Sequence, residues 1–176
     1  MIRIAPPLEK TVRSWDLAAT EPSETNPNPD WTCGVKMGVT PDGRFVVTHV
    51  ELARKRSDGV RQLVLRTAGH DTEEVTIRLP QDPAQAGVDQ KDSYAKLLAG
   101  FTVVFERETG SKETRADPFA AQWQAGNVDV VIGDWNADFF AQLEGFPSKK
   151  VKDDAVDGVT GAFRQLLSRP TMWEVL

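Results

Sequence analysis

Hydrophobic and polar residues along the first third of the chain follow the pattern of three short strands. Residues 11–18 alternate in part and predict the first strand. Residues 32–40 and 44–52 predict two more, and the Pro-Asp-Gly sequence at 41–43 is typical of the tight turn of a hairpin. We therefore expect three antiparallel neighbours, with the proline-rich residues 21–30 as a loop after the first strand.

The rest of the chain has the spacing of alternating helices and strands. The predicted helices are 58–68, 88–98, 116–124, 135–143 and 153–167, and the predicted strands are 74–79, 102–106 and 128–132. Three antiparallel strands followed by β–α units predict an α/β protein with a mixed sheet, in which parallel strands follow the antiparallel ones and helices flank both faces. This is the element order of the RNase H-like fold.

Length and composition predict one soluble globular domain. The 176 residues are 40% hydrophobic and 27% charged. We expect a lead-in over residues 1–10, the domain over 11–168 and a tail over 169–176. No apolar run has the length of a membrane span, and the N-terminus lacks the apolar segment of a secretory signal, so neither a membrane partner nor secretion is expected. A lone Cys33 excludes an internal disulfide and favours a reducing cytosolic setting.

The charge balance limits what the chain binds unaided. The formal net charge is −5 and the isoelectric point is about 5.1. Such a balance argues against tight, unaided binding of nucleic acid, which usually depends on a basic field. It does not exclude a metal-dependent nuclease, because bound divalent ions reverse the local field.

Two isolated acids stand where a sheet commonly places ligands. Asp16 lies inside the first predicted strand, and burying a carboxylate there is costly unless it is paired or ligates a metal. An exposed position that caps the next loop explains it equally well. Asp82 follows the fourth predicted strand, at the carboxyl end where open α/β sheets bind ligands. An aspartate followed by proline is also an ordinary turn sequence, which by itself is the simpler explanation.

Asp153, Asp154 and Asp157 open the last predicted helix. Capping and the helix dipole favour acids there, but three exceed what one cap requires, because like charges at this spacing repel and a bound cation would relieve them. On an ideal helix Asp153 and Asp157 flank the apolar face, whereas Asp154 points further toward solvent. We therefore expect Asp153 as a direct metal ligand, with Asp157 or Asp154 as the second. The apolar face itself consists of Val156, Val159, Phe163, Leu166 and Leu167.

The three acidic positions converge if the first strand is central, the fourth lies beside it and the last helix crosses both. Oxygen ligands of this kind suit Mg²⁺ or Mn²⁺. Two such ions about 3.5–4 Å apart activate water and stabilise the leaving oxygen of a phosphodiester. Beside these acids, Lys149, Lys150 and Lys152 are candidates for contact with the DNA backbone. A solvated surface is the commoner role of such basic clusters.

Four segments in order resemble the C-terminal nuclease domain of phage terminase large subunits, of the RNase H-like superfamily. They are SWDLA at 14–18, LPQDPAQAG at 79–87, TGSKETRADPFAAQWQAGNV at 109–128 and WNADFFAQLEGFPSKKVKDDAVDG at 135–158. The resemblance extends from about Val12 to Leu167. The sequence departs from the family pattern at Lys152, where a histidine is usual, and at Gly158, where an alanine is common.

The resemblance implies a metal-dependent endonuclease that cuts concatemeric double-stranded viral DNA in the cytoplasm of an infected bacterium. It implies metal ligands at Asp16, Asp82 and the group Asp153, Asp154 and Asp157. The implied partners besides DNA are the terminase ATPase domain, the portal and the small terminase subunit. The phosphate-binding G-x-x-x-x-G-K-[ST] sequence of a packaging ATPase does not occur here. Two alternatives stay open: a docking or DNA-binding module of the packaging motor with weak or lost cleavage, and a junction-resolvase-like nuclease.

Overall fold

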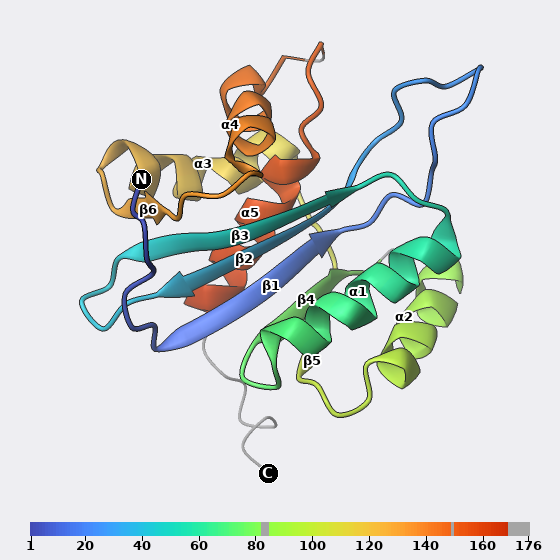
Figure 1. Ribbon diagram of the computed structural model, residues 1–176, viewed down its shortest axis with the longest axis horizontal. Helices are drawn as coiled ribbons and strands as arrows, with labels where there is room; N and C mark the ends of the chain where they lie inside the picture. The colour runs from blue at the N-terminus through green and yellow to red at the C-terminus, as the bar shows by residue number, and fades with distance from the viewer. Residues whose placement is uncertain (82–84, 149, 169–176) are drawn as a thin grey trace.

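One mixed sheet with helices on both faces forms the part of the protein that the computed structural model describes, residues 1–81, 85–148 and 150–168 (Figure 1). The strands are β1 (Lys10–Asp16), β2 (Thr32–Val39), β3 (Phe45–Ala53), β4 (Thr76–Pro80), β5 (Val103–Glu106) and β6 (Val128–Val130). The helices are α1 (Ser57–Asp71), α2 (Gln85–Leu97), α3 (Lys112–Gln124), α4 (Asn136–Gly145) and α5 (Asp154–Leu167). Among the described residues, no helix is both long and apolar enough to cross a membrane.

The order of these elements confirms the predicted order of strands and helices. The largest difference in bounds is at α3, which begins at Lys112, four residues before the predicted start. Ser111 is its N-cap, and the hydroxyl accepts a hydrogen bond of 3.2 Å from the backbone N–H of Thr114. Pro118 lies inside the helix. The cap is a local signal that extends the helix over the basic residues of the SKETR segment.

The sheet places β1 at its centre, as predicted. The strand order is β5-β4-β1-β2-β3-β6. β1 is antiparallel to β2, and β2 is antiparallel to β3, whereas β4 runs parallel to β1, β5 to β4 and β6 to β3. Parallel pairing brings the carboxyl ends of β1 and β4 to the same edge of the sheet. Asp16 is the last residue of β1 at that edge.

Two hydrophobic cores lie on the two faces of the sheet. Side chains alternate along β1, so Val12 packs into one core and Trp15 into the other. In Figure 1, α5 lies behind the strands together with α3 and α4, and α1 and α2 lie on the opposite face. The first core also includes Met37, Phe139 and Phe163, and the second includes Leu63, Leu79 and Tyr94.

Helix α5 lies against the sheet through small residues. A Cβ atom on Gly158 would come within 2.8 Å of Val35 Cγ2, and one on Gly161 would come within 2.9 Å of Arg78 Nη1 and still closer to the Ser14 hydroxyl. Glycine at 158, where the resemblance leads one to expect alanine, is therefore explained by the contact with Val35. These glycines set how closely the start of the helix approaches β1 and β2.

The predicted apolar face of this helix is confirmed except at its last position. Val156, Val159, Phe163 and Leu166 are buried, whereas Leu167 is 59% exposed. Leu167 is the final residue of the helix and is rotated by about 100° from Leu166, which carries its side chain away from the core.

Replacing Gly161 by alanine tests this close approach. We expect Gly161→Ala to lower the free energy of unfolding by about 1–3 kcal/mol, because the new methyl group overpacks Ser14 and the guanidinium of buried Arg78. The matched control is Gly69→Ala in α1, where a Cβ meets no atom within 4 Å. It should raise the unfolding free energy by about 0.5–1 kcal/mol through helix propensity. Urea denaturation measures both, and equal effects of the two substitutions would contradict the packing argument.

Candidate active site

Asp16 is the centre of a group of acids at the edge of the sheet. It ends β1 on the face that α5 covers, and its side chain is only partly exposed. Burial raises the pKa of Asp16 to about 8, and the carboxylates of Asp157 and Asp154 add to the rise, whereas the Lys112 ammonium opposes it. The first strand and the last helix therefore bring their acids together, as predicted.

Asp154 faces this group, and the expectation that it points toward solvent is wrong. The residue is only 6% exposed, and one carboxylate oxygen accepts a hydrogen bond of 3.1 Å from the backbone N–H of Trp31. Burial is the main cause that raises the pKa of Asp154. The prediction took the large apolar side chains as the sheet-facing side. Gly158 and Gly161 also face the sheet, and Asp154 lies one turn before Gly158 and two turns before Gly161.

Asp157 is buried and held by two cations from α3. Its Oδ1 accepts a hydrogen bond of 2.7 Å from Nη2 of Arg115, and its Oδ2 lies 2.5 Å from Nζ of Lys112. Arg115 also pairs with Glu108 at 3.0 Å. Sequence reasoning did not single out Lys112, Arg115 or Glu108 as site residues. Their signal was the SKETR segment, in which Lys112 and Arg115 are three residues apart and share a side of the helix.

Asp153 lies at the rim of the group. It is the N-cap residue of α5, with φ of −133° and ψ of 19°, and its side chain caps no helical N–H. The side chain is 39% exposed and pairs with Nζ of Lys112 at 2.7 Å. Because its backbone is not helical, the ideal-helix projection that placed it beside the apolar face does not apply to Asp153. Its role as a metal ligand stays a prediction.

The donors at this edge suit part of a metal site. Asp16 and Asp154 supply carboxylate oxygens, the donors that Mg²⁺ and Mn²⁺ prefer. Burial is the main cause that raises the pKa of both carboxyls, and neighbouring carboxylates add to it, so a divalent cation beside them would favour their ionised forms. Within the described residues, however, no group of three or more His, Cys, Asp or Glu side chains is arranged to hold an ion. Asp82, the remaining predicted ligand, follows β4 but lies outside the described residues.

The predicted DNA-contacting lysines differ in their surroundings. Lys150 is exposed. Lys152 pairs with Asp30 at 2.5 Å, on the loop between β1 and β2. Lys149 lies outside the described residues. Of the described pair, Lys150 is therefore the more available for a phosphate.

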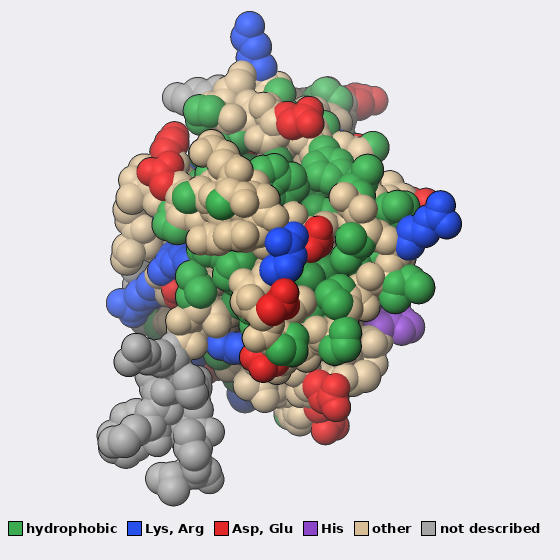
Figure 2. Space-filling model, turned by 90° about the vertical axis from the view of Figure 1, so that its left-hand side faces the viewer, with side chains coloured by type: hydrophobic (Ala, Val, Ile, Leu, Met, Phe, Trp, Pro, Cys, Tyr) green, Lys and Arg blue, Asp and Glu red, His purple; other side chains and the backbone are tan. Residues whose placement is uncertain are grey.

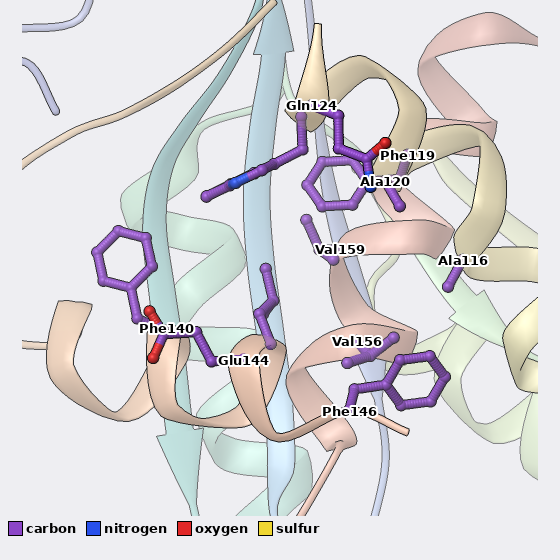
Figure 3. Close-up of a pocket in the computed structure, with 11 residues that line it drawn as sticks. Ala116, Phe119, Ala120, Gln124, Phe140, Glu144, Phe146, Val156 and Val159 are labelled. Atoms are coloured by element: carbon purple, nitrogen blue, oxygen red, sulfur yellow. The ribbon is translucent and has the colours of Figure 1, made fainter. Parts of the chain in front are cut away.

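A separate apolar cavity of about 280 Å³ lies between α3, α4 and α5. Figure 3 shows Phe119, Phe146, Val156 and Val159 around it, with Glu144 among the other residues that line it. It borders the acidic group through the backbone of α5, since Val156 directly precedes Asp157. Its lining offers few polar groups, so the acidic edge of the sheet, rather than this cavity, carries the candidate chemistry.

Comparison with known proteins places this geometry in a family. The family model described as the Terminase RNaseH-like domain matches residues 13–165. That range includes Asp16 and all of the acids at the start of α5. No curated protein sequence matches the chain.

Solved structures of nucleases and resolvases share the fold. The large terminase nuclease from thermophilic phage G20c with bound zinc is 14% identical, with a TM-score of 0.63 over 89% of this chain and 81% of that one. The Fowlpox virus resolvase in complex with Holliday junction DNA is 9% identical, with a TM-score of 0.54 over 89% and 96% of the two chains. A yeast mitochondrial Holliday junction resolvase is 10% identical, with a TM-score of 0.53 over 89% and 78%. The RNase H-like fold predicted from the sequence is confirmed.

The raised pKa of Asp16 predicts how stability depends on pH without metal. The unfolded chain loses the Asp16 proton near pH 4, whereas the folded chain keeps it up to about pH 8. Wild-type stability therefore falls as pH rises through this window, and Asp16→Asn removes the loss. We expect the melting temperature of Asp16→Asn in EDTA to equal that of the wild type near pH 4 and to exceed it by several degrees near pH 8.

Asp42→Asn is the control for this titration. The hydrogen bond from Thr40 lowers the pKa of exposed Asp42. Ionisation of Asp42 therefore stabilises the folded state, and this stabilisation is present above the ordinary carboxyl pKa. Its variant should lose stability relative to the wild type as pH rises. A pH-independent difference for Asp16→Asn would contradict the burial of an uncompensated carboxyl.

Proposed function

Because the chain belongs to the Terminase RNaseH-like domain family, we propose that it is a metal-dependent endonuclease that cuts concatemeric double-stranded viral DNA during genome packaging. The observation that carries the proposal is the convergence of Asp16 and Asp154 at one edge of the sheet. Buried carboxylates without enough counter-charge destabilise the fold, and a bound divalent cation would stabilise them. Residues 11–168 would form the nuclease domain.

Asp16 and Asp154 would hold a Mg²⁺ or Mn²⁺ ion from the strand and the helix, and we propose Asp82 as a further ligand. A divalent ion in such a site supplies Lewis acidity toward a phosphodiester and makes bound water a better nucleophile. The protein's own part is to fix the carboxylates. β1 holds Asp16, the backbone N–H of Trp31 orients Asp154, and Arg115 with Lys112 orients Asp157. The two-ion arrangement expected from the sequence would need its second position beside Asp157.

Two other functions have weaker support. The likeness to Holliday junction resolvases favours a junction-cleaving nuclease, but the family match over residues 13–165 favours the terminase assignment. A docking or DNA-binding module without cleavage would not require buried, undercompensated acids. Parallel assays on plasmid DNA and on a four-way junction distinguish these functions. A terminase nuclease cuts the plasmid, a resolvase prefers the junction, and a docking module cuts neither.

The proposed setting is the packaging motor at the procapsid, in the cytoplasm of the infected bacterium. The ATPase domain of the terminase, the portal and the small terminase subunit would be its protein partners, and double-stranded DNA its substrate. The chain's charge suits a nuclease that depends on a motor to hold DNA, because a net charge of −5 gives little attraction of its own. On the face shown in Figure 2, acidic and basic side chains are interspersed with hydrophobic ones.

Cleavage assays test the metal site. We expect plasmid cutting with Mn²⁺ at least as fast as with Mg²⁺, because looser sites tolerate Mn²⁺ more readily. We expect no cutting in EDTA. Asp16→Asn and Asp154→Asn should each reduce the rate by more than about 100-fold, since loss of a direct ligand costs at least as much as loss of its supporting contacts.

The Asp153→Asn variant tests whether Asp153 is a metal ligand or only a residue at the rim of the site. If Asp153 serves only as the N-cap residue of α5 and as an ion-pair partner of Lys112, this variant should retain cleavage within about tenfold of the wild type, since Asn also suits an N-cap. A complete loss would restore the sequence-based assignment of Asp153 as a ligand. Full activity of Asp16→Asn, or cutting that persists in EDTA, would refute the proposed function.

DNA binding by the chain should be weak and sensitive to salt. We expect Lys150→Gln to flatten the slope of log affinity against log salt by about one unit, because one phosphate contact is lost. Lys152→Gln should flatten it less, since this ammonium already pairs with Asp30. Lys96→Gln on α2, across the sheet, is the control. Equal slopes for the wild type and Lys150→Gln in fluorescence anisotropy would exclude Lys150 from the DNA interface.

A further inference from the structure

Two cations from α3 lie where a second metal ion of this site would be expected. Nζ of Lys112 lies between Asp153 Oδ1, at 2.7 Å, and Asp157 Oδ2, at 2.5 Å. Nη2 of Arg115 lies 2.7 Å from the other oxygen of Asp157 and 3.0 Å from Glu108. Both carboxylate oxygens of Asp157 are therefore engaged by positive charge supplied by the protein itself.

Lys112 occupies a position on its helix that is unfavourable for a positive charge, and its ion pairs with the acids offset this cost. Lys112 is the first residue of α3, where the helix dipole disfavours a positive charge. The helix is nevertheless fixed there, because the Ser111 cap defines its start and buried Phe119 packs into the core beside α5. Ion pairs with Asp153 and Asp157 offset the unfavourable dipole, so the lysine is held toward the site.

These ion pairs are shielded from water. The side chains of Arg115 and Asp157 are 13% and 10% exposed, and that of Lys112 is 26% exposed. Attraction between charges strengthens in such surroundings, and separating a buried pair leaves an uncompensated charge. A cation entering beside Asp157 would therefore have to displace Lys112 or Arg115 at a considerable cost.

The described charges around the site leave a net negative charge that a divalent ion would offset. Six acids face four cations among the described residues, so two negative charges remain when all the acids are ionised, and the proposed ligand Asp82 would add a third. The acids are Asp16, Asp153, Asp154, Asp157, Glu106 and Glu108, and the cations are Arg78, Lys112, Arg115 and Arg164. Among the described residues, Asp16 and Asp154 are the two of these six acids that form no ion pair with a cation.

We propose that Lys112, supported by Arg115, is a built-in counter-ion that takes the place of the second metal ion, so that the site binds a single divalent ion tightly. The inference rests on the proposed metal-dependent function and deepens it. Lys112 is a positioning residue in this scheme, because it fixes Asp157 and keeps a positive charge beside the ion position. It also excludes a second ion from Asp157.

Metal binding measured without DNA tests this directly. Titration of the full chain with Mn²⁺, with free Mn²⁺ followed by electron paramagnetic resonance, gives the number of bound ions and their affinity. We expect one ion for the wild type. Lys112→Met keeps the length of the side chain but removes its charge, and we expect it to bind two ions or to bind the first at least about tenfold more tightly.

Three further variants complete the experiment. Lys112→Arg keeps the charge and should bind one ion with wild-type affinity. Lys96→Met, at an exposed site on the opposite face, should also behave as the wild type. Lys112→Gln gives the same neutral-side-chain test if Lys112→Met does not fold, as judged by circular dichroism.

The outcomes separate this inference from the proposed function. Two ions in the wild type, or unchanged stoichiometry and affinity in the folded neutral variants, would overturn the counter-ion role and leave a metal-dependent nuclease standing. No Mn²⁺ binding by any variant would overturn both. One ion in the wild type with a gain on neutralising Lys112 supports the inference.

Discussion

The close approach of α5 to β1 and β2 is the constraint on which the site depends. Gly158 and Gly161 leave no side chain between the helix and the sheet, and a Cβ at either position would overlap a neighbour. This contact brings the first turn of α5 onto the carboxyl end of β1. Asp154 and Asp157 are thereby buried beside Asp16, and their carboxylates cannot avoid one another. The clustering of acidic side chains at this site is thus a consequence of helix packing.

Burial of these acids explains the rest of the charge arrangement. A buried carboxylate is tolerated when it is paired with a cation, hydrogen-bonded or bound to a metal. Asp157 is paired with Lys112 and Arg115, and Asp154 accepts a backbone hydrogen bond from Trp31. Burial, together with the neighbouring Asp157 and Asp154 carboxylates, raises the pKa of Asp16 to about 8. The metal position that we propose is therefore the place where the protein leaves its own charges uncompensated.

The opposite face of the sheet shows that the same strands also carry a closed charge network. Arg13 is buried on β1 and donates to both oxygens of Asp71, at 2.7 and 2.9 Å, while Lys36 pairs with Asp71 at 3.0 Å. The arginine's remaining contacts go to Gly34 and His49. Asp71 is paired with two cations in this network, and their effect outweighs that of burial and lowers the pKa of Asp71. Side-chain alternation along β1 thus places a network with paired charges on one face of the sheet and a candidate site with unpaired acids on the other.

The sequence by itself determined the order of the elements, the central position of β1 and the positions of the acids, because hydrophobic periodicity and turn residues are local signals. It also carried the family resemblance. It did not determine how far the sheet-facing side of α5 extends, since Gly158 and Gly161 carry no apolar side chain and yet make close contacts with the sheet. Asp154 was therefore placed wrongly. The pairing of Lys112 and Arg115 with Asp157 spans about forty residues, and no local pattern encodes a contact between α3 and α5. Only the tertiary packing brings those charges together, because buried charges must find partners wherever the fold places them.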